Sequence, residues 1–460
     1  MFEGCGSAEL LDLMGDAQQA ERAAFAQQLL AVGEYTVRRI AEQTDEHDFW
    51  CVDGWEQIAA EVSAELGISR KRASSQMSYG QSLIERLPRL GDVFRAGAVD
   101  FRVIAAAIYR SDLITDPDAL AAIDAQLAAK APAWNSLSRE KIAELVDWMV
   151  IDADPEAIRV AKQRDLDRHI DIRPGHNGMA EIWGEVRGPD AAALDHTLNE
   201  LAATVCPNDP RTHTQRRTDA LTPLAAKATS MPCTCGTPDC PAAGSEAPTN
   251  PLAINVIAEA ATVEGRSSKP GYLPGYGAVP AATVAEMATT ASLRPVPSAK
   301  DLGAESTYRP SAALTRFVQC RDLTCSFPGC DQPAVNCDID HSVPYPQGPT
   351  HPSNNGLKCR IHHLLKTFCG WTDRQLPDGT IEWTSPRGRT YTSEPVGAQF
   401  FPQLGQPTET LTLPNSPPPD PNRESAMPKR KRTRAQDRAH RVQYERGLNR
   451  ARYAADPPPF

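Results

Sequence analysis

The sequence lacks long apolar runs. No uninterrupted apolar stretch approaches the roughly 18 residues that a membrane-spanning helix requires. The first residues, MFEGCGSAELLDLMG, contain neither the basic start nor the apolar core of a secretory signal. No internal repeat is present, which argues against a repeat array. Together these absences predict a cytoplasmic protein with no membrane partner.

The charge of the chain is unevenly distributed. At 460 residues the chain is too long for one core, so two or three domains are expected. The net charge of −10 argues at first against a nucleic-acid partner. Residues 421–460, however, hold eleven Lys or Arg against four Asp or Glu, a balance of +7 that leaves −17 for the first 420 residues. This asymmetry is typical of an acidic folded body with a basic arm that attracts phosphates.

Periodicity divides the chain into four segments and predicts an α+β fold. Residues 1–165 have the apolar spacing of helices, for example at Trp55, Ile58 and Val62. The period changes to two near 169–172 and 179–183, which predicts a small β-hairpin. The predicted segments are an α-helical domain at 1–165, its α/β continuation with a Cys-rich loop at 166–300, a compact Cys/His module at 309–395, and a disordered, Pro-rich and basic tail at 401–460.

The Cys/His module contains the ligand types of two different metal sites. Twelve cysteines would be many for a cytoplasmic enzyme, but six of them fall between Cys320 and Cys369. The pairs Cys325-x4-Cys330 and Cys359-x2-His362 have the spacing of a structural zinc site. The motifs DIDH, SNN and CRIHH also contain side chains of the types that bind a harder ion and activate water. These are Asp340, His341, Asn354 and His363.

A second cysteine group lies in the Cys-rich loop. Its spacing is Cys233-x-Cys235-x4-Cys240, and three thiolates do not complete a tetrahedron. Cys206 or His213 is the candidate fourth ligand. Zinc binding and simple reduced thiols are equally consistent with this pattern.

A helix-turn-helix rhythm occurs in the N-terminal segment. One apolar helix ends at Gly67, Ser69 caps the next, and Arg70, Lys71 and Arg72 open it where base or phosphate contacts would fall. The pattern predicts DNA contact, but an ordinary helical hairpin in a bundle produces the same pattern.

The ordered set CSFPGC, DIDH, SNN and CRIHH resembles an HNH nuclease. The wider chain resembles the mycobacterial 13E12 repeat family, on the stretches LGISRKRASSQMSYGQSLIERLPRL, TYRPSAALTRFVQCRDLTCSFPGC and CDIDHSVPYPQGPTHPSNNGLKCRIHHLLKT. Proteins of that family join an N-terminal domain of unknown function to a C-terminal HNH module. The resemblance implies a zinc-stabilised ββα-metal fold and an association with mobile or repeated DNA elements.

The resemblance also implies a role for each motif residue. His341 would be the general base, and Asp340 and His363 would bind a catalytic Mg²⁺ or Mn²⁺ ion. Asn354 would complete that site or fix the orientation of His341. Arg360 and Lys366, expected on the exposed side of the last helix, would hold a phosphate. Zn²⁺ on the Cys325, Cys330, Cys359 and His362 set would be structural.

The sequence thus predicts a metal-dependent endonuclease that hydrolyses DNA phosphodiester bonds. The alternative is a non-catalytic, zinc-containing DNA-binding or regulatory protein, in which the DH pair, the Asn and the second His are incidental to a zinc ribbon.

Overall fold

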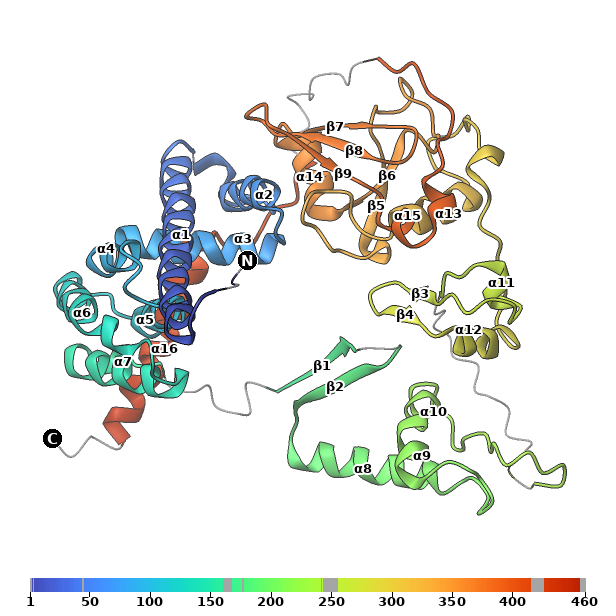
Figure 1. Ribbon diagram of the computed structural model, residues 1–460, viewed down its shortest axis with the longest axis horizontal. Helices are drawn as coiled ribbons and strands as arrows, with labels where there is room; N and C mark the ends of the chain where they lie inside the picture. Colours follow the sequence, from blue (N-terminus) through green and yellow to red (C-terminus); the bar gives the residue numbers. More distant parts are fainter. Residues whose placement is uncertain are drawn as a thin grey trace. The chain divides into compact units, whose positions relative to one another are not determined.

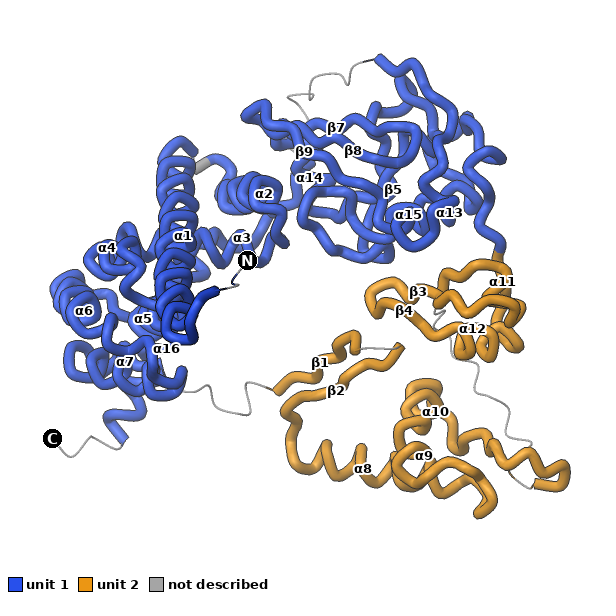
Figure 2. The backbone as a smooth tube through the Cα atoms, viewed as in Figure 1, with its two compact units in different colours: residues 1–160, 295–460 blue, residues 161–294 orange. Residues whose placement is uncertain are grey.

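The computed structural model describes residues 2, 4–43, 45–159, 168–175, 178–240, 242, 255–414 and 426–455. The chain forms two compact units, residues 1–160 together with 295–460, and residues 161–294 (Figure 2). The fold is α+β, as predicted, with helices and small antiparallel sheets. No helix in the described part of the chain is both long and apolar enough to cross a membrane.

The N-terminal part of the first unit is an α-helical bundle, as predicted. Its helices are α1 (Ser7–Ala41), α2 (Gly54–Leu66), α3 (Arg70–Glu85), α4 (Pro88–Arg95), α5 (Phe101–Ser111), α6 (Pro117–Lys130) and α7 (Arg139–Ala153) (Figure 1). Their apolar faces meet in one core that includes Phe94, Ile104, Leu127 and Val146. Side-chain oxygens at several helix starts accept backbone N–H groups, which satisfies donors that the helix itself cannot pair. These caps are Asp53, Ser69, Asp100, Asp116 and Ser138.

Helices α1 and α3 approach each other closely at two glycines. A Cβ atom at Gly33 would lie 2.4 Å from the backbone of Gly80, and one at Gly80 would lie 2.5 Å from the carbonyl oxygen of Leu29. Any side chain at either position would force the two backbones apart. The predicted helical hairpin is present in the same region, because α2 ends at Gly67 in a left-handed conformation and Ser69 caps α3.

The Cys/His module follows helix α13 (Ala312–Asp322) and has a hairpin-helix order. Strand β5 (Cys337–His341) pairs antiparallel with β6 (Asn355–Cys359), so that His341 lies opposite Asn355 and Cys337 opposite Cys359. Helix α14 (Arg360–Phe368) begins directly after β6. A three-stranded sheet of β7 (Thr372–Gln375), β8 (Ile381–Thr384) and β9 (Thr390–Ser393) closes the module, and α15 (Val396–Phe400) follows.

The module and the helical bundle share an apolar core. Phe327 packs edge-on against Trp371 and Trp383, with ring centroids 4.9 and 5.1 Å apart. Trp50 and Ala64 of the bundle belong to the same buried cluster. The predicted helical domain and the predicted Cys/His module are therefore parts of one compact unit.

The prediction of a disordered tail is wrong for residues 426–455. Helix α16 (Arg434–Ala455) packs on the bundle, and Val442 is buried in the bundle core. Asn449 is buried and donates to the carbonyl oxygens of Glu156 and Ile158, at 2.7 and 2.8 Å. Met427 reaches the core that the module shares with the bundle. Residues 415–425 and 456–460 of the predicted tail lie outside the described residues.

Several basic side chains of this tail face acidic side chains of the bundle. Composition alone could not show this, because the partners are hundreds of residues away in sequence. The ion pairs are Arg430 and Arg434 with Asp53 (2.7 and 2.6 Å), Arg438 with Asp112 (2.7 Å), Arg446 with Asp154 (2.6 Å) and Arg450 with Glu156 (2.8 Å).

The second unit contains smaller elements. The predicted hairpin is present as β1 (His169–Pro174) and β2 (Ala180–Glu185), although residues 176–177 of its turn lie outside the described residues. The other elements are α8 (Gly188–Ala202), α9 (His213–Asp219), α10 (Leu221–Ala225), α11 (Ala260–Val263), β3 (Gly271–Leu273), β4 (Gly277–Val279) and α12 (Ala281–Ala288). A small buried cluster, Leu201, Val205, Ala220 and Met231, joins α8 to the segment after α10.

Packing of α16 on the bundle gives a first prediction. Val442→Ala should lower the free energy of unfolding by roughly 1–3 kcal/mol, because it removes methyl groups from a packed core. Leu448→Ala on the same helix should change it by less than about 0.5 kcal/mol, because the Leu448 side chain is 47% exposed. Urea denaturation of the full chain measures both values. Equal effects of the two substitutions would contradict the docking of α16.

Candidate functional site

The four predicted zinc ligands converge in the structure. One ligand atom from each of Cys325, Cys330, Cys359 and His362 lies within 4.8 Å of the others. The Nδ1 atom of His362 is 3.4 Å from Cys325 Sγ and 3.2 Å from Cys359 Sγ. Three thiols and an imidazole form the donor set of a closed tetrahedral zinc site, so the cluster could bind a metal such as zinc.

Local structure fixes these ligands. Cys359 is the last residue of β6 and precedes α14, whose first turn carries His362, so the short C-x2-H spacing turns both side chains to one point. The ring of His362 stacks on Phe327 at a centroid distance of 3.9 Å. The backbone N–H of Cys359 also donates to Cys325 Sγ at 3.2 Å.

The pKa values of two thiols in this cluster are shifted in opposite directions. Burial raises the pKa of Cys325 well above its usual value. Hydrogen bonds from Cys325 and Cys330 lower the pKa of Cys359. A bound cation would favour the thiolate form of all these cysteines, because metal binding requires thiolates and compensates their charge.

One face of α14 lies against one face of β5. Arg360, His363 and Lys366 are three residues apart along the helix and therefore share a face. Asp338 and Asp340 alternate along β5 and point to the same side of the strand. His363 Nδ1 is 2.8 Å from Asp338, and His363 Nε2 is 3.4 Å from Asp340 Oδ1.

The predicted catalytic metal ligands, Asp340 and His363, are therefore adjacent. Two ligands in neighbouring positions around an ion, each at about 2.1 Å, lie about 3 Å apart, close to the observed separation. Two protein ligands suit Mg²⁺, which retains several waters when bound. The donor set fits a hard divalent ion.

The prediction that Lys366 lies on the exposed side of α14 is wrong. Its side chain is 11% exposed and contacts Asp340 Oδ2 and Asp373, both at 2.8 Å. The carboxylates of Asp340 and Asp373 hold the charge of Lys366 inside the module. Arg360 does point outward, with a side chain 63% exposed and 3.4 Å from Asp338.

A buried charge network beneath this face was missed from the sequence. Lys358 on β6 is fully buried and lies 3.0 Å from Asp373 and 3.3 Å from Asp340. Burial alone would lower the pKa of Lys358, but the two carboxylates raise it above its usual value. Burial would likewise raise the pKa of Asp340, yet the charges of Lys358 and Lys366 lower it. Asp340 is therefore ionised at neutral pH. In sequence, β6 shows only a single lysine among uncharged residues.

His341 follows Asp340 as the last residue of β5, and its side chain is buried. Its Nε2 atom lies 2.8 Å from Thr350 Oγ1, and its ring stacks on Tyr308 at a centroid distance of 5.4 Å. Thr350 donates its only hydroxyl proton to the carbonyl of Thr307. Thr350 must then accept from His341, which places the proton of the neutral imidazole on Nε2. Burial lowers the pKa of His341 and favours this neutral form.

Asn354 holds the loop that follows β5. Its Oδ1 accepts from the N–H of Val343 at 2.8 Å, and its Nδ2 donates to the carbonyls of Val343 and Pro349 at 3.0 and 2.9 Å. Of the two roles considered for Asn354, these bonds correspond to fixing the segment around His341. The amide is occupied by backbone groups and none of these bonds goes to Asp340 or His363, so the structure gives no support to the metal-ligand role.

The three predicted DNA-contacting cations of α3 differ in exposure and in ion pairing. Lys71 and Arg72 are exposed. Arg70 instead pairs with Glu56 of α2 at 2.6 Å, and Glu56 is also paired with Arg434 of the tail. Because its charge is largely compensated, Arg70 is the weakest candidate of the three for phosphate contact.

The fold and site define a helical-bundle protein with a C-terminal Cys/His cluster that could bind a metal. Over residues 16–322 the chain matches the family described as a domain of unknown function, DUF222. It is 43% identical to the uncharacterized protein Rv3776 of Mycobacterium tuberculosis, over 95% of this chain and 89% of that protein. It is 41% identical to the uncharacterized protein Rv2100 of the same organism, over 98% and 90% of the two chains.

The chain therefore belongs to the DUF222 family. The match to the family ends at residue 322, before the first ligand of the Cys/His cluster. No solved structure matches the chain. The names of these relatives assign no activity, so the chemistry has to be argued from the site.

The convergence of the Cys/His cluster gives a second prediction. Cys359→Ser should lower bound zinc by about one ion per chain and unfold residues 310–395, because a structural zinc site is coupled to folding. Cys369→Ser, a half-buried thiol of the same module outside the cluster, should retain the zinc. Metal analysis and circular dichroism of the full chain measure the difference. Unchanged metal content in Cys359→Ser would remove this residue from the ligand set.

Proposed function

We propose that this protein is a metal-dependent endonuclease of the HNH type that hydrolyses DNA phosphodiester bonds. The observation that carries the proposal is the 3.4 Å approach of Asp340 Oδ1 to His363 Nε2 between a β-hairpin and a helix, with His341 next in sequence to Asp340. The resemblance of the ordered motifs to HNH nucleases supports the same proposal.

His341 would act as the general base. With its proton on Nε2 and held by Thr350, its Nδ1 atom carries the lone pair that can accept a proton from water. The water oxygen would then bond to phosphorus, the bond from phosphorus to the leaving oxygen would break, and that oxygen would take up a proton. Thr350 is thus a positioning residue, since it selects the tautomer.

Asp340 and His363 would hold the divalent ion. Asp338 accepts from His363 Nδ1 at 2.8 Å, which leaves Nε2 free to ligate and orients the ring toward Asp340. Lys358 and Lys366 engage the other oxygen of Asp340 and keep the carboxylate ionised. A divalent ion bound there would supply positive charge to the phosphate and to the leaving oxygen.

Phosphate contact would come from cations that remain exposed. Arg360 lies on the outer side of the His363 face, and Lys71 and Arg72 lie at the start of α3. Lys366 would act on the site through Asp340, since its ammonium group is enclosed by carboxylates.

The third prediction concerns His341. His341→Ala should reduce plasmid cleavage in Mg²⁺ or Mn²⁺ by about 10²-fold or more, because positioned proton transfer contributes about 10²–10⁴-fold to such reactions. His196→Ala, whose side chain is 74% exposed on α8, should leave cleavage unchanged. Zinc content and circular dichroism should be the same in all three proteins. Equal cutting by His341→Ala and wild type would exclude His341 as the base.

The second candidate function is non-catalytic DNA binding. It is favoured by the exposure of Lys71 and Arg72 at the N-terminus of α3, within a helix-turn-helix hairpin. Unchanged plasmid with the wild type across several divalent ions, together with retained DNA binding, would select this function over the nuclease.

A fourth prediction measures the α3 contact. The double substitution Lys71→Ala, Arg72→Ala should weaken DNA binding and reduce the slope of log affinity against log salt by about two, since each lost phosphate contact contributes about 0.9. The matched control is Arg139→Ala, Lys141→Ala at the start of α7, which also carries two exposed cations. Equal slopes for the two double variants would show that α3 makes no specific contribution.

A further inference from the structure

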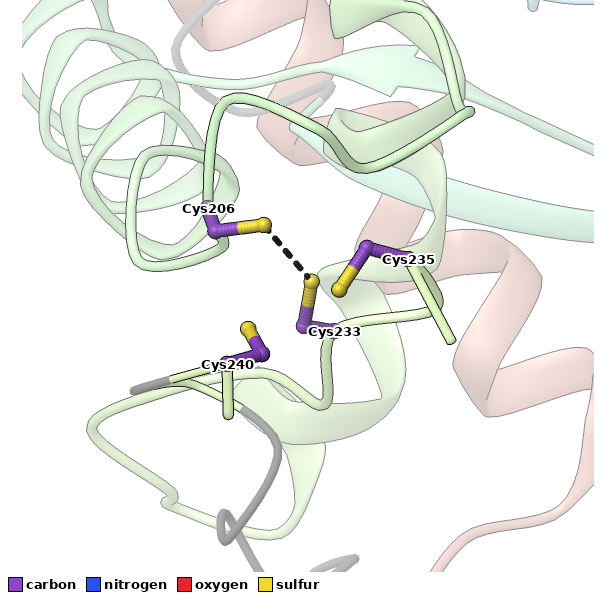
Figure 3. Close-up of side chains that lie close together, drawn as sticks. All are labelled: Cys206, Cys233, Cys235 and Cys240. Carbon is purple, nitrogen blue, oxygen red and sulfur yellow. Dashed lines mark hydrogen bonds between the residues drawn. The ribbon is translucent and has the colours of Figure 1, made fainter. Parts of the chain in front are cut away.

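Four cysteine side chains gather in the second unit. Four sulfur atoms lie within 4.8 Å of one another, those of Cys206, Cys233, Cys235 and Cys240. Cys206 Sγ is 3.5 Å from Cys233 Sγ (Figure 3). The sequence did not decide whether Cys206 or His213 is the fourth ligand. The structure brings Cys206 into the group, whereas His213 is the first residue of α9.

The spacing of the sulfurs fits one shared ion. Four thiolates at about 2.3 Å from a tetrahedral zinc lie about 3.8 Å from one another. In Figure 3 the four side chains point toward a common centre from two separate loops. Cys206 comes from the loop after α8, and the other three come from the loop after α10.

A buried carboxylate ties these two loops together. Asp209 accepts from the side chain of Arg211 at 2.8 Å and from the backbone N–H of Thr234 at 2.9 Å. The backbone N–H of Asp209 donates to the carbonyl of Cys206 at 3.1 Å. Asp209 thus links the neighbours of Cys206 to the neighbours of Cys233, and the alignment of the sulfurs does not depend on the thiols alone.

The loop after α10 forms a tight turn around a sulfur. Thr237 donates its backbone N–H to Cys235 Sγ at 3.5 Å, and Cys240 donates to the carbonyl of Thr237 at 3.1 Å. Gly236 has a φ of 70°, which a residue with a side chain rarely adopts.

This region has little apolar surface to stabilise it. The buried cluster that joins α8 to the segment after α10 consists of Leu201, Val205, Ala220 and Met231. A core of this size contributes little to the free energy of folding, and small domains commonly gain the remainder from a structural metal.

We propose that Cys206, Cys233, Cys235 and Cys240 bind one zinc ion that folds residues 188–240 of the second unit. Four thiolates leave no open coordination position, so the ion is structural rather than catalytic. The site is independent of the zinc cluster in the first unit and of the proposed nuclease.

Metal analysis of the full chain, purified under reducing conditions, tests the proposal. The wild type should contain two zinc ions per chain. Cys233→Ser and Cys359→Ser should each contain one, and the double variant none. Cys5→Ser, which replaces an exposed cysteine outside both groups, should retain both ions. A wild type with a single ion that Cys359→Ser removes would overturn the proposal.

Two further measurements separate ligand loss from misfolding. Cys206→His keeps a zinc-binding side chain and should retain both ions, whereas Cys206→Ser should lose one. In Cys233→Ser, amide hydrogen exchange should accelerate in residues 188–240 but not in α5 or α7. A wild-type mass two hydrogens lower than that of the reduced chain, with Cys206 joined to Cys233, would show a disulfide and overturn the proposal. So would iron in place of zinc.

Discussion

The convergence of Cys325, Cys330, Cys359 and His362 is the constraint on which the C-terminal module depends. These residues come from the loop after α13, the end of β6 and the first turn of α14. Cys359 is also the last residue of β6, which pairs with β5 so that Cys337 lies opposite Cys359 and His341 opposite Asn355. Cys359 and His362 thus lie where the hairpin joins α14, and Asp340 of the hairpin approaches His363 of the same helix.

The same cluster connects the module to the helical bundle. Phe327 lies between Cys325 and Cys330 in sequence, stacks on His362, and packs against Trp371 and Trp383. Trp50 and Ala64 of the bundle complete this core. Phe327 covers the ring of His362, and the side chains of Cys325, Cys359 and His362 are buried, which would strengthen the attraction between these ligands and a bound ion. The predicted domains at 1–165 and 309–395 therefore behave as one body rather than as two units joined by a linker.

The sequence predicted the features that depend on short spacing and missed those that depend on distant pairing. The two short pairs of Cys/His ligands and the end of α2 at Gly67 were predicted because each is determined within a few residues, whereas the β5–β6 hairpin was implied by the resemblance to HNH nucleases. Lys366 was misplaced because the carboxylates that it contacts, Asp340 and Asp373, lie on other strands. Lys358 and Asp373 could not be found, since β6 and β7 belong to different sheets and their contact is visible only in three dimensions. The buried network exists because two lysines and two aspartates compensate one another, and that balance is visible only in three dimensions.

The basic tail shows why composition misled. Its excess of positive charge is a property of the sequence, but composition does not show that several of its arginines pair with acidic side chains of the bundle. Exposed ion pairs contribute only about 0–1 kcal/mol each, so they select the orientation of α16 more than they hold it in place. Burial of Val442 and the two hydrogen bonds of Asn449 supply the attachment. A polyanion that bound these arginines would have to displace Asp53, Asp112 and Glu156 first. Phosphate contact is therefore better assigned to cations that do not pair with a carboxylate of the bundle. Arg70 is an example of a paired cation: it lies at the start of the same helix as Lys71 and Arg72, but it forms an ion pair with Glu56.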